Sequence, residues 1–258
     1  LKAQAKKYDM VKPSEEDKVA VANPEAVTDE EFARIKAKLE YSRTNEDKNL
    51  ESKRGEEVDN TDNKIATITK EGNNIVATYK DGSKDVRPLS DFTKLDKQPA
   101  IDAVKKAAED KIAAINSTPN ATDEEKAAAV AKVNADKEKA LTAINDATAK
   151  DALDQAQNNG TTAISADNPV VAKKDAAKAD VEAARKAKED AIKADTNLTQ
   201  AEKDAAIAKN NTAAAEATKA IDAATTNDAV DQAKTAGTTA IGKVNPVAKE
   251  NAKEAIAN

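Results

Sequence analysis

The fold of this chain is decided by residues 151–170, which read DALDQAQNNGTTAISADNPV. This stretch returns almost intact at residues 228–247, as DAVDQAKTAGTTAIGKVNPV. The second copy starts 77 residues after the first, at Asp228 rather than Asp151. A fixed period of this length is typical of a repeat array. We therefore expect residues from about 97 onward to be two copies of one unit, with a third copy beginning at the C-terminus.

The same offset relates positions throughout the unit, beyond the quoted stretch. The residues that recur are Gly160 and Gly237, Ile164 and Ile241, Pro169 and Pro246, Asn120 and Asn197, Thr122 and Thr199, and Val104 and Val181. The repeat is therefore a whole structural unit rather than a short motif.

Composition excludes several classes of function. The 258 residues carry a net charge of −6 and lack the basic stripe that marks a nucleic-acid-binding protein. The chain has no Cys and no His, which removes disulfides, thiolate chemistry, zinc sites built on these residues and the usual general base. No apolar run is long enough to span a bilayer. We predict no catalytic, cofactor-binding or metal-ligating residues, no enzyme activity, no nucleic-acid partner and no membrane insertion.

The aromatic residues end where an alanine-rich sequence begins. All five aromatic residues precede residue 93, and the sequence beyond is rich in Ala, which favours helix. Because the chain starts at Leu1 without a signal peptide, we interpret it as an internal fragment of a larger protein. The predicted divisions are a tail at 1–12, a small α+β domain at 13–96, three-helix repeats at 97–173 and 174–250, and the start of a third repeat at 251–258.

The first ninety residues predict a strand, a helix and a three-stranded meander. Residues 18–22 alternate as a short strand does, and Thr28 with Glu31 forms a capping box at a helix start. Strands within residues 64–92 are separated by turns at Gly72 and Gly82, and Pro88 makes the third strand short or places it at an edge. The helix is expected to cover one sheet face. The predicted core is Phe32, Ile35, Leu39, Tyr79 and Phe92.

Each repeat is predicted to contain three helices. Apolar residues recur at spacings of three and four, and capping boxes at Thr122 with Glu125 and at Thr199 with Glu202 start the second helix of each copy. Thr148 can cap the third helix of the first copy. The apolar positions are Ile101, Val104, Ala108, Ile112 and Ile115, then Val130, Val133, Ala140 and Ile144, then Leu153, Ala156, Gly160 and Ile164, with Ile207, Asn210, Ala217 and Ile221 in the second copy.

Gly160 has two interpretations. A Gly just past a helix end is often a C-cap, which would end the helix at Asn158. The apolar stripe, however, continues in register through Gly160 to Ile164. We favour a continuous helix in which Gly160 permits close approach of a neighbouring helix.

The joint between repeats carries a helix-start signal. Asn168-Pro169 and Asn245-Pro246 each resemble an N-cap followed by Pro at the first helical position. The last helix of one unit should then run nearly straight into the first helix of the next. The predicted fold is mainly α: tandem three-helix bundles in an extended rod, preceded by a small α+β domain, and monomeric.

The densest acidic group is formed by Glu56, Glu57, Asp59 and Asp62. Calcium prefers such oxygen ligands, but EF-hand spacing with its central Gly is absent, so a solvated loop is the favoured interpretation. Residues 54–56, Arg-Gly-Glu, are assigned to the same loop rather than to an integrin-type motif. Residues 159–161, Asn-Gly-Thr, fit a glycosylation sequon without implying its use.

The helical units resemble the DUF1542 repeat of Gram-positive surface proteins. The resemblance rests on residues 168–206, on DQAQNNGTTAI at 154–164, and on the second copy. It implies an extracellular stalk within a cell-wall-anchored adhesin. The N-terminal part resembles a Rib-like β-rich module through ANPEAVTDEEF at 22–32 and TYKDGSKDVRPLSDF at 78–92, although the polar stretch at 44–63 departs from the compact pattern.

Two functional hypotheses follow, with a third behind them. The first is a structural spacer whose partners are the neighbouring repeats of the same chain. The alternative is a module that binds a host extracellular-matrix or plasma protein through the N-terminal domain or a bundle face. The third is a self-associating coiled coil that links cells.

Overall fold

The computed structural model describes residues 3–43 and 65–245. The chain divides into two compact units, Leu1–Lys105 with Glu138–Thr161, and Lys106–Lys137 with Thr162–Asn258. The acidic group at residues 56–62, residues 54–56 and residues 251–258 lie outside the described residues.

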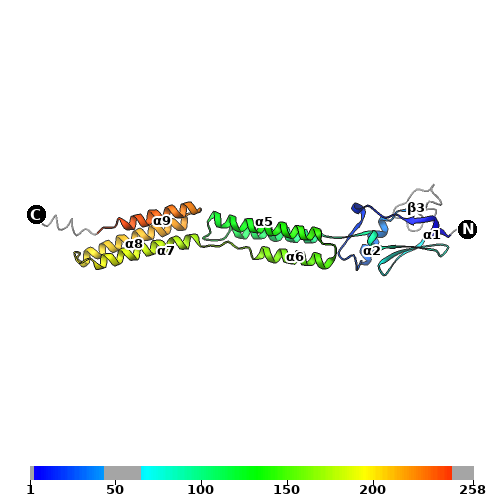
Figure 1. Cartoon of the computed structure of the whole chain (residues 1–258), viewed down its shortest axis with the longest axis horizontal. Coiled ribbons are helices and arrows are strands. Elements are labelled where there is room, and N and C mark those ends of the chain that lie inside the picture. The colour runs from blue at the N-terminus through cyan, green and yellow to red at the C-terminus, as the bar shows by residue number, and fades with distance from the viewer. Residues whose placement is uncertain (1–2, 44–64, 246–258) are drawn as a thin grey trace. The chain divides into compact units, whose positions relative to one another are not determined.

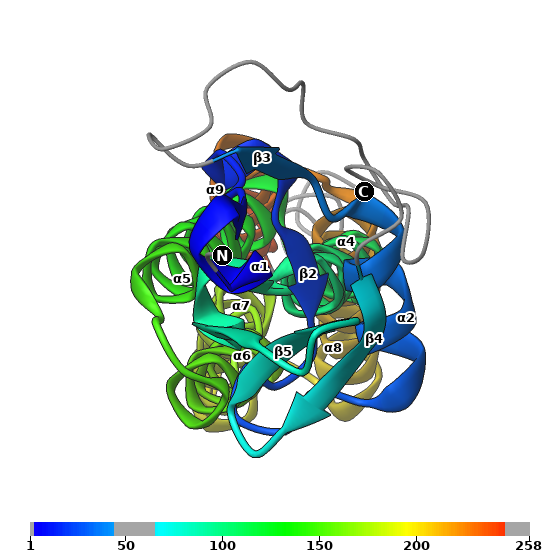
Figure 2. The ribbon, with the colours of Figure 1, turned by 90° about the vertical axis from the view of Figure 1, so that its right-hand side faces the viewer.

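The N-terminal region contains the predicted meander and further strands. β4 (Ile65–Glu71), β5 (Asn74–Tyr79) and β6 (Lys84–Pro88) form an antiparallel sheet in the order β4-β5-β6, and Figure 2 shows β4 beside β5. Gly72 and Gly82 have positive φ values of 60° and 85° in the two turns, as predicted. Pro88 ends the edge strand β6, where it costs no ladder hydrogen bond.

Two small sheets complete this region. β1 (Tyr8–Met10) pairs antiparallel with β3 (Tyr41–Arg43), and β2 (Val19–Val21) pairs parallel with β7 (Thr93–Leu95). The other elements among the described residues of this region are α1 (Gln4–Lys7), η1 (Glu15–Asp17), α2 (Asp29–Lys38) and η2 (Leu89–Asp91). β2 confirms the strand predicted at residues 18–22, whereas the strands at 8–10, 41–43 and 93–95 were not predicted.

The prediction of a tail at residues 1–12 is wrong. Tyr8 and Met10 are buried in the same core as Tyr41 and Tyr79, and the rings of Tyr8 and Tyr79 stack with centroids 5.9 Å apart. Burial of an aromatic ring and a thioether stabilises the folded state, so packing of Tyr8 and Met10 in the core holds this short strand in place. The five residues predicted to form the core are all buried.

From residue 98 the described chain is helical. The helices are α4 (Gln98–Asn116), α5 (Asp123–Asp146), α6 (Lys150–Ser165), α7 (Lys173–Ala194), α8 (Gln200–Ala223) and α9 (Asn227–Gly242). Figure 1 shows α7, α8 and α9 side by side, and one buried cluster that includes Val181, Ile221 and Ile241 joins them. The described part of the chain has no helix that is both long and apolar enough to cross a membrane.

Gly160 lies inside a continuous helix, as predicted. A Cβ at this position would overlap the Cβ of Ala140 in α5 and lie 3.5 Å from Val104 Cγ2 in α4. Gly237 has the same relation to Ala217 and Val181. Each glycine therefore removes the atom that would keep three helices apart, and α4, α5 and α6 meet as α7, α8 and α9 do.

Two predicted helix starts are wrong. α7 begins at Lys173 rather than at Asn168-Pro169, because the Asn168 Oδ1 accepts a hydrogen bond from Lys111 Nζ at 2.6 Å instead of capping a helix. Residues 166–172 are therefore a connection, and α6 does not run directly into α7. α6 begins at Lys150, which puts Ala149 and not Thr148 next to the first turn. Of the pair Asn245-Pro246, the described residue Asn245 is non-helical.

We expect Gly160→Ala to lower the free energy of unfolding of the helical part. The added methyl would overlap Ala140, and overpacking costs about 1–3 kcal/mol, more than the helix-propensity gain of up to about 1 kcal/mol. Gly242→Ala is the matched control, because nothing lies within 4 Å of its added Cβ. Denaturant unfolding followed by circular dichroism at 222 nm measures both, and equal midpoints for the two variants would contradict the packing role.

Candidate functional site

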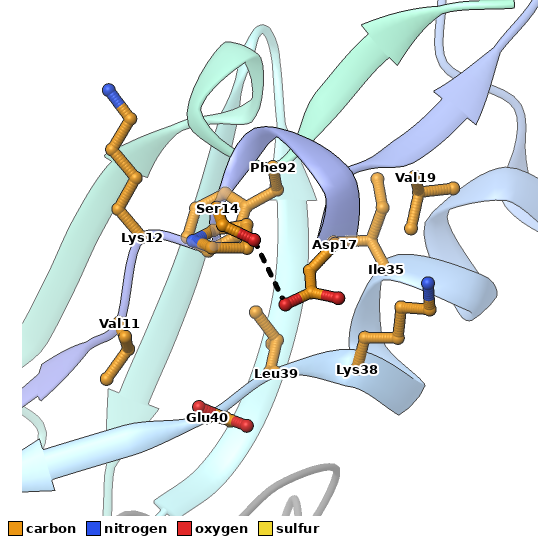
Figure 3. A pocket seen from close by; sticks show the side chains of 11 residues that line it. Val11, Lys12, Ser14, Asp17, Val19, Ile35, Lys38, Leu39, Glu40 and Phe92 are labelled. Atoms are coloured by element: carbon orange, nitrogen blue, oxygen red, sulfur yellow. Dashed lines mark hydrogen bonds between the residues drawn. The ribbon is translucent and has the colours of Figure 1, made fainter.

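A pocket of about 130 Å³ opens in the N-terminal region (Figure 3). Its wall contains the buried side chains of Val19, Ile35, Leu39 and Phe92. At its rim, the Ser14 hydroxyl donates to Asp17 Oδ2 at 3.1 Å. The other lining residues are Val11, Lys12, Pro13, Lys38 and Glu40. The pocket has room for one apolar side chain, and its Ser–Asp pair closes a local turn at η1.

The described residues contain no group of three or more Asp, Glu, His or Cys placed to hold a metal ion. The acidic group that the sequence offered for calcium lies outside this part of the chain. Several polar groups converge where α5 begins. We call this region the repeat junction, formed by residues 122–125, 167–173 and 225–227.

Glu125 uses both carboxylate oxygens at the repeat junction. Oε1 accepts the Thr122 N–H at 2.9 Å, and the Thr122 hydroxyl accepts the Glu125 N–H at 3.2 Å, which completes the predicted capping box. Oε2 accepts the N–H groups of Ala172 at 2.8 Å and Lys173 at 3.1 Å, at the start of α7. One carboxylate therefore caps its own helix and the first helix of the next repeat.

Glu124 makes the equivalent contact with a different helix. Its Oε1 and Oε2 accept the Asn227 N–H at 3.2 and 2.8 Å, at the first residue of α9. Next to it, the Asp123 N–H donates to the Thr225 carbonyl at 2.8 Å. The first turn of α5 thus binds the starts of two helices, where carboxylates are favoured by the unpaired N–H groups and the helix dipole.

Burial and hydrogen bonding shift the pKa of the Glu125 carboxyl in opposite directions. Burial raises the pKa of its carboxyl, while the N–H groups of Ala172, Thr122 and Lys173 lower it, and the net result is a pKa below the ordinary glutamate value. The charged form is therefore the one that the folded junction binds.

Asp167 is a further ionisable group of the repeat junction. Its side chain is buried, and Oδ1 lies 3.1 Å from Lys132 Nζ. Burial raises the pKa of Asp167, Asp136 raises it further, and the Lys132 ammonium opposes both without reversing the shift. The corresponding residue of the second repeat is Val244, which is buried with Ile192 and Ala206. A charge therefore occupies a position that an apolar side chain fills in the other copy.

Lysines bind the ends of neighbouring helices in both repeats. Lys111 Nζ donates to the Ser165 carbonyl at 2.8 Å, and the equivalent Lys188 donates to the carbonyls of Gly242 and Val244 at 3.1 and 3.2 Å. Cations at carbonyl ends satisfy the orphan acceptors of a helix C-terminus. Sequence alone does not distinguish these lysines from solvated surface residues, and only their recurrence at the repeat period could have indicated this role.

The sequence located the capping boxes but not the contacts that Glu125 and Glu124 make with the second repeat. Thr122 with Glu125 and Thr199 with Glu202 are both present as predicted. Glu124 resembles any acidic first-turn residue, so its contact with Asn227 depends on folding across 103 positions of sequence.

A family model described as Domain of Unknown Function (DUF1542) matches residues 96–172 and again residues 173–249. The two matches cover more than half of the chain. Neither a search of curated proteins nor a search of solved structures found a significant match.

We expect Glu125→Gln to reduce the free energy of unfolding at pH 7 by about 1–2 kcal/mol, because charge-assisted hydrogen bonds to helix N–H groups are replaced by weaker ones. Because the folded pKa lies below the ordinary value of 4.5, this contribution is complete above pH 4.5 and is lost as the pH falls through the folded pKa. Denaturant unfolding between pH 7 and 3 should show the two proteins converging in acid. The exposed Glu216→Gln in α8 is the control, and a difference that grows in acid would contradict the assignment.

We expect Asp167→Val to raise the free energy of unfolding by about 1 kcal/mol. An incompletely paired buried charge costs desolvation energy, and apolar replacement of buried ion pairs is often neutral or stabilising. The reciprocal Val244→Asp should lower stability by about 2–3 kcal/mol, because it buries a carboxylate in an apolar cluster. Chemical denaturation measures both, and a loss of stability in Asp167→Val would show that the pair with Lys132 is net favourable.

Proposed function

Since the chain belongs to the DUF1542 family, we propose that it is a spacer segment of a bacterial cell-surface protein, placed outside the cell and anchored to a Gram-positive cell wall. Its action is geometric: successive repeats set the distance between the wall and a binding region of the parent protein. This proposal includes no enzyme activity. In it the neighbouring repeats are the principal partners.

The observation that carries the proposal is the hydrogen bonding of Glu125 to Ala172 and Lys173. A connection joining independent domains needs no such contacts, whereas a spacer gains stiffness when one repeat fixes the start of the next. Tandem repeats that contact only their neighbours form quasi-one-dimensional arrays. A 24-residue helix such as α5 is about 36 Å long, so each added repeat would add reach of that order.

The N-terminal pocket favours a second candidate function. Its apolar wall suits an apolar side chain of a host matrix or plasma protein, and Lys12, Lys38, Asp17 and Glu40 surround that wall with charges of both signs. In this alternative the N-terminal region, proposed as a Rib-like module, binds and the repeats project it.

Affinity capture from plasma and matrix extracts tests that alternative. The full chain is compared with a Lys12→Glu, Lys38→Glu variant, and with Lys186→Glu on the exposed face of α7 as the control. A protein that is captured by the wild type and the control but lost with the pocket variant would support binding. Equal capture by all three would remove the pocket from consideration.

We expect small-angle scattering of the full chain to give a radius of gyration well above about 18 Å, the value for a compact 258-residue domain, and independent of concentration. The physical reason is that, in the proposed spacer, repeats joined through their ends would increase its length and not its width, which raises the radius of gyration. A compact profile would remove the main support for a spacer. A profile that grows with concentration would favour self-association of the chain instead.

A further inference from the structure

We propose that the second residue after the capping-box threonine, Glu124 in the first repeat and Ala201 in the second, determines how firmly a repeat binds the one that follows it. The surface concerned is the first turn of the second helix. The partner that fits it is the leading edge of another DUF1542 repeat. The biological meaning of this inference rests on the proposed spacer function.

The seated example is within this chain. Glu125 binds the start of α7, and Glu124 binds the start of α9. The Asp123 N–H donates to the carbonyl of Thr225, two residues before α9. α9 also has its own cap, since the Thr226 hydroxyl accepts the Ala229 N–H at 3.1 Å. Glu124 satisfies a different donor, the Asn227 N–H, so the two caps are complementary rather than redundant.

The second repeat has the capping box but lacks the residue that corresponds to Glu124. Its capping box is complete, with the Thr199 hydroxyl accepting the Glu202 N–H at 3.1 Å and Glu202 Oε1 accepting the Thr199 N–H at 2.9 Å. Ala201 stands where the first repeat has Glu124, and a methyl group accepts no hydrogen bond. The first repeat therefore binds two leading helices of the second through carboxylates, and we infer that a repeat with Ala at this position lacks the carboxylate contact with the third helix of its successor.

The contacts of Glu124 and Glu125 depend little on the sequence of the following repeat. Every donor that they bind in that repeat is a backbone N–H, at Ala172, Lys173 and Asn227. Any repeat whose first and third helices begin at the same places presents these donors. The residue at position 124 thus determines how stiff the junction with the following repeat is. An array with Glu at this position in some repeats and Ala in others has stiff and loose junctions in a defined order.

The test is Glu124→Ala in the full chain, with Glu216→Ala in α8 as the control. We expect the Asn227 amide to exchange with solvent deuterium roughly tenfold faster, as loss of a charge-assisted hydrogen bond implies. The Lys173 amide, bound by Glu125, should keep its exchange rate. Nuclear magnetic resonance resolves the two amides, and the backbone of α8 reports on the bundle itself.

Two cysteines give an independent measure, since the chain has none of its own. Spin labels at Ala135→Cys in α5 and Ala179→Cys in α7, both exposed, report the distance across the repeat junction. We expect a broader distance distribution in Glu124→Ala than in the control.

Unchanged exchange at Asn227 or an unchanged distance distribution would overturn the inference. Equal acceleration at Asn227 and in the middle of α8 would also overturn it, because Glu124 would then stabilise the bundle rather than the junction. The spacer function fails separately: a compact scattering profile rejects it whatever the exchange rate of Asn227.

Discussion

A glutamate that uses both carboxylate oxygens recurs at the decisive points of this chain. In the N-terminal region, Glu31 Oε1 accepts the Thr28 N–H at 3.0 Å and Oε2 accepts the Ala22 N–H at 2.9 Å. Glu125 divides its oxygens in the same way between Thr122 and the start of α7. In both glutamates burial raises the pKa, but the N–H donors lower it by more, so the net pKa lies below the ordinary glutamate value and the charged form prevails. One charge therefore fixes where a helix begins and which segment lies beside it.

This arrangement matters because the helices bury few large side chains. Within each bundle the helices approach most closely through small residues, at Gly160 and Ala140 in the first repeat and at Gly237 and Ala217 in the second. A buried methylene contributes about 0.8 kcal/mol, whereas a hydrogen bond to a charged group contributes about 1.5–3 kcal/mol. One such contact at a helix end is thus comparable with the full burial of one Val, Leu or Ile side chain, which contributes about 1.5–3 kcal/mol. Lys111 and Lys188 also make contacts at helix ends, through the carbonyls that they bind.

The parts of the fold that could be predicted from sequence are those set by neighbours along the chain. Spacings of three and four gave the helices, Thr-x-x-Glu gave the caps, and the stripe through Gly160 gave its close contact. Pairing of β1 with β3 and of β2 with β7 joins segments that are distant in the sequence through three residues each. Such short strands carry too little periodicity for their partners to be recognised from sequence. Asn168-Pro169 led to a wrong prediction because the two residues are typical of a helix start. In the structure the Asn168 side chain binds Lys111 instead of capping a helix. The repeat junction was missed for the same reason, since Glu124 and Asn227 meet only after folding.

Comparison of the two copies separates what a repeat needs from what it can vary. The glycine, alanine and valine of the helix contact are the same in both, because no larger residue fits the space at Gly160 and Gly237. Inside the second bundle Asn210 replaces Val133, and it remains buried by donating from Nδ2 to the Arg185 carbonyl at 2.8 Å. At the repeat ends the residues differ between the copies: Asp167 corresponds to Val244, and Glu124 corresponds to Ala201 although α5 and α8 span equivalent residues. Variation at these ends alters how one repeat binds the next and leaves each bundle intact, which is the freedom that a repeat array needs to vary its stiffness without losing its fold.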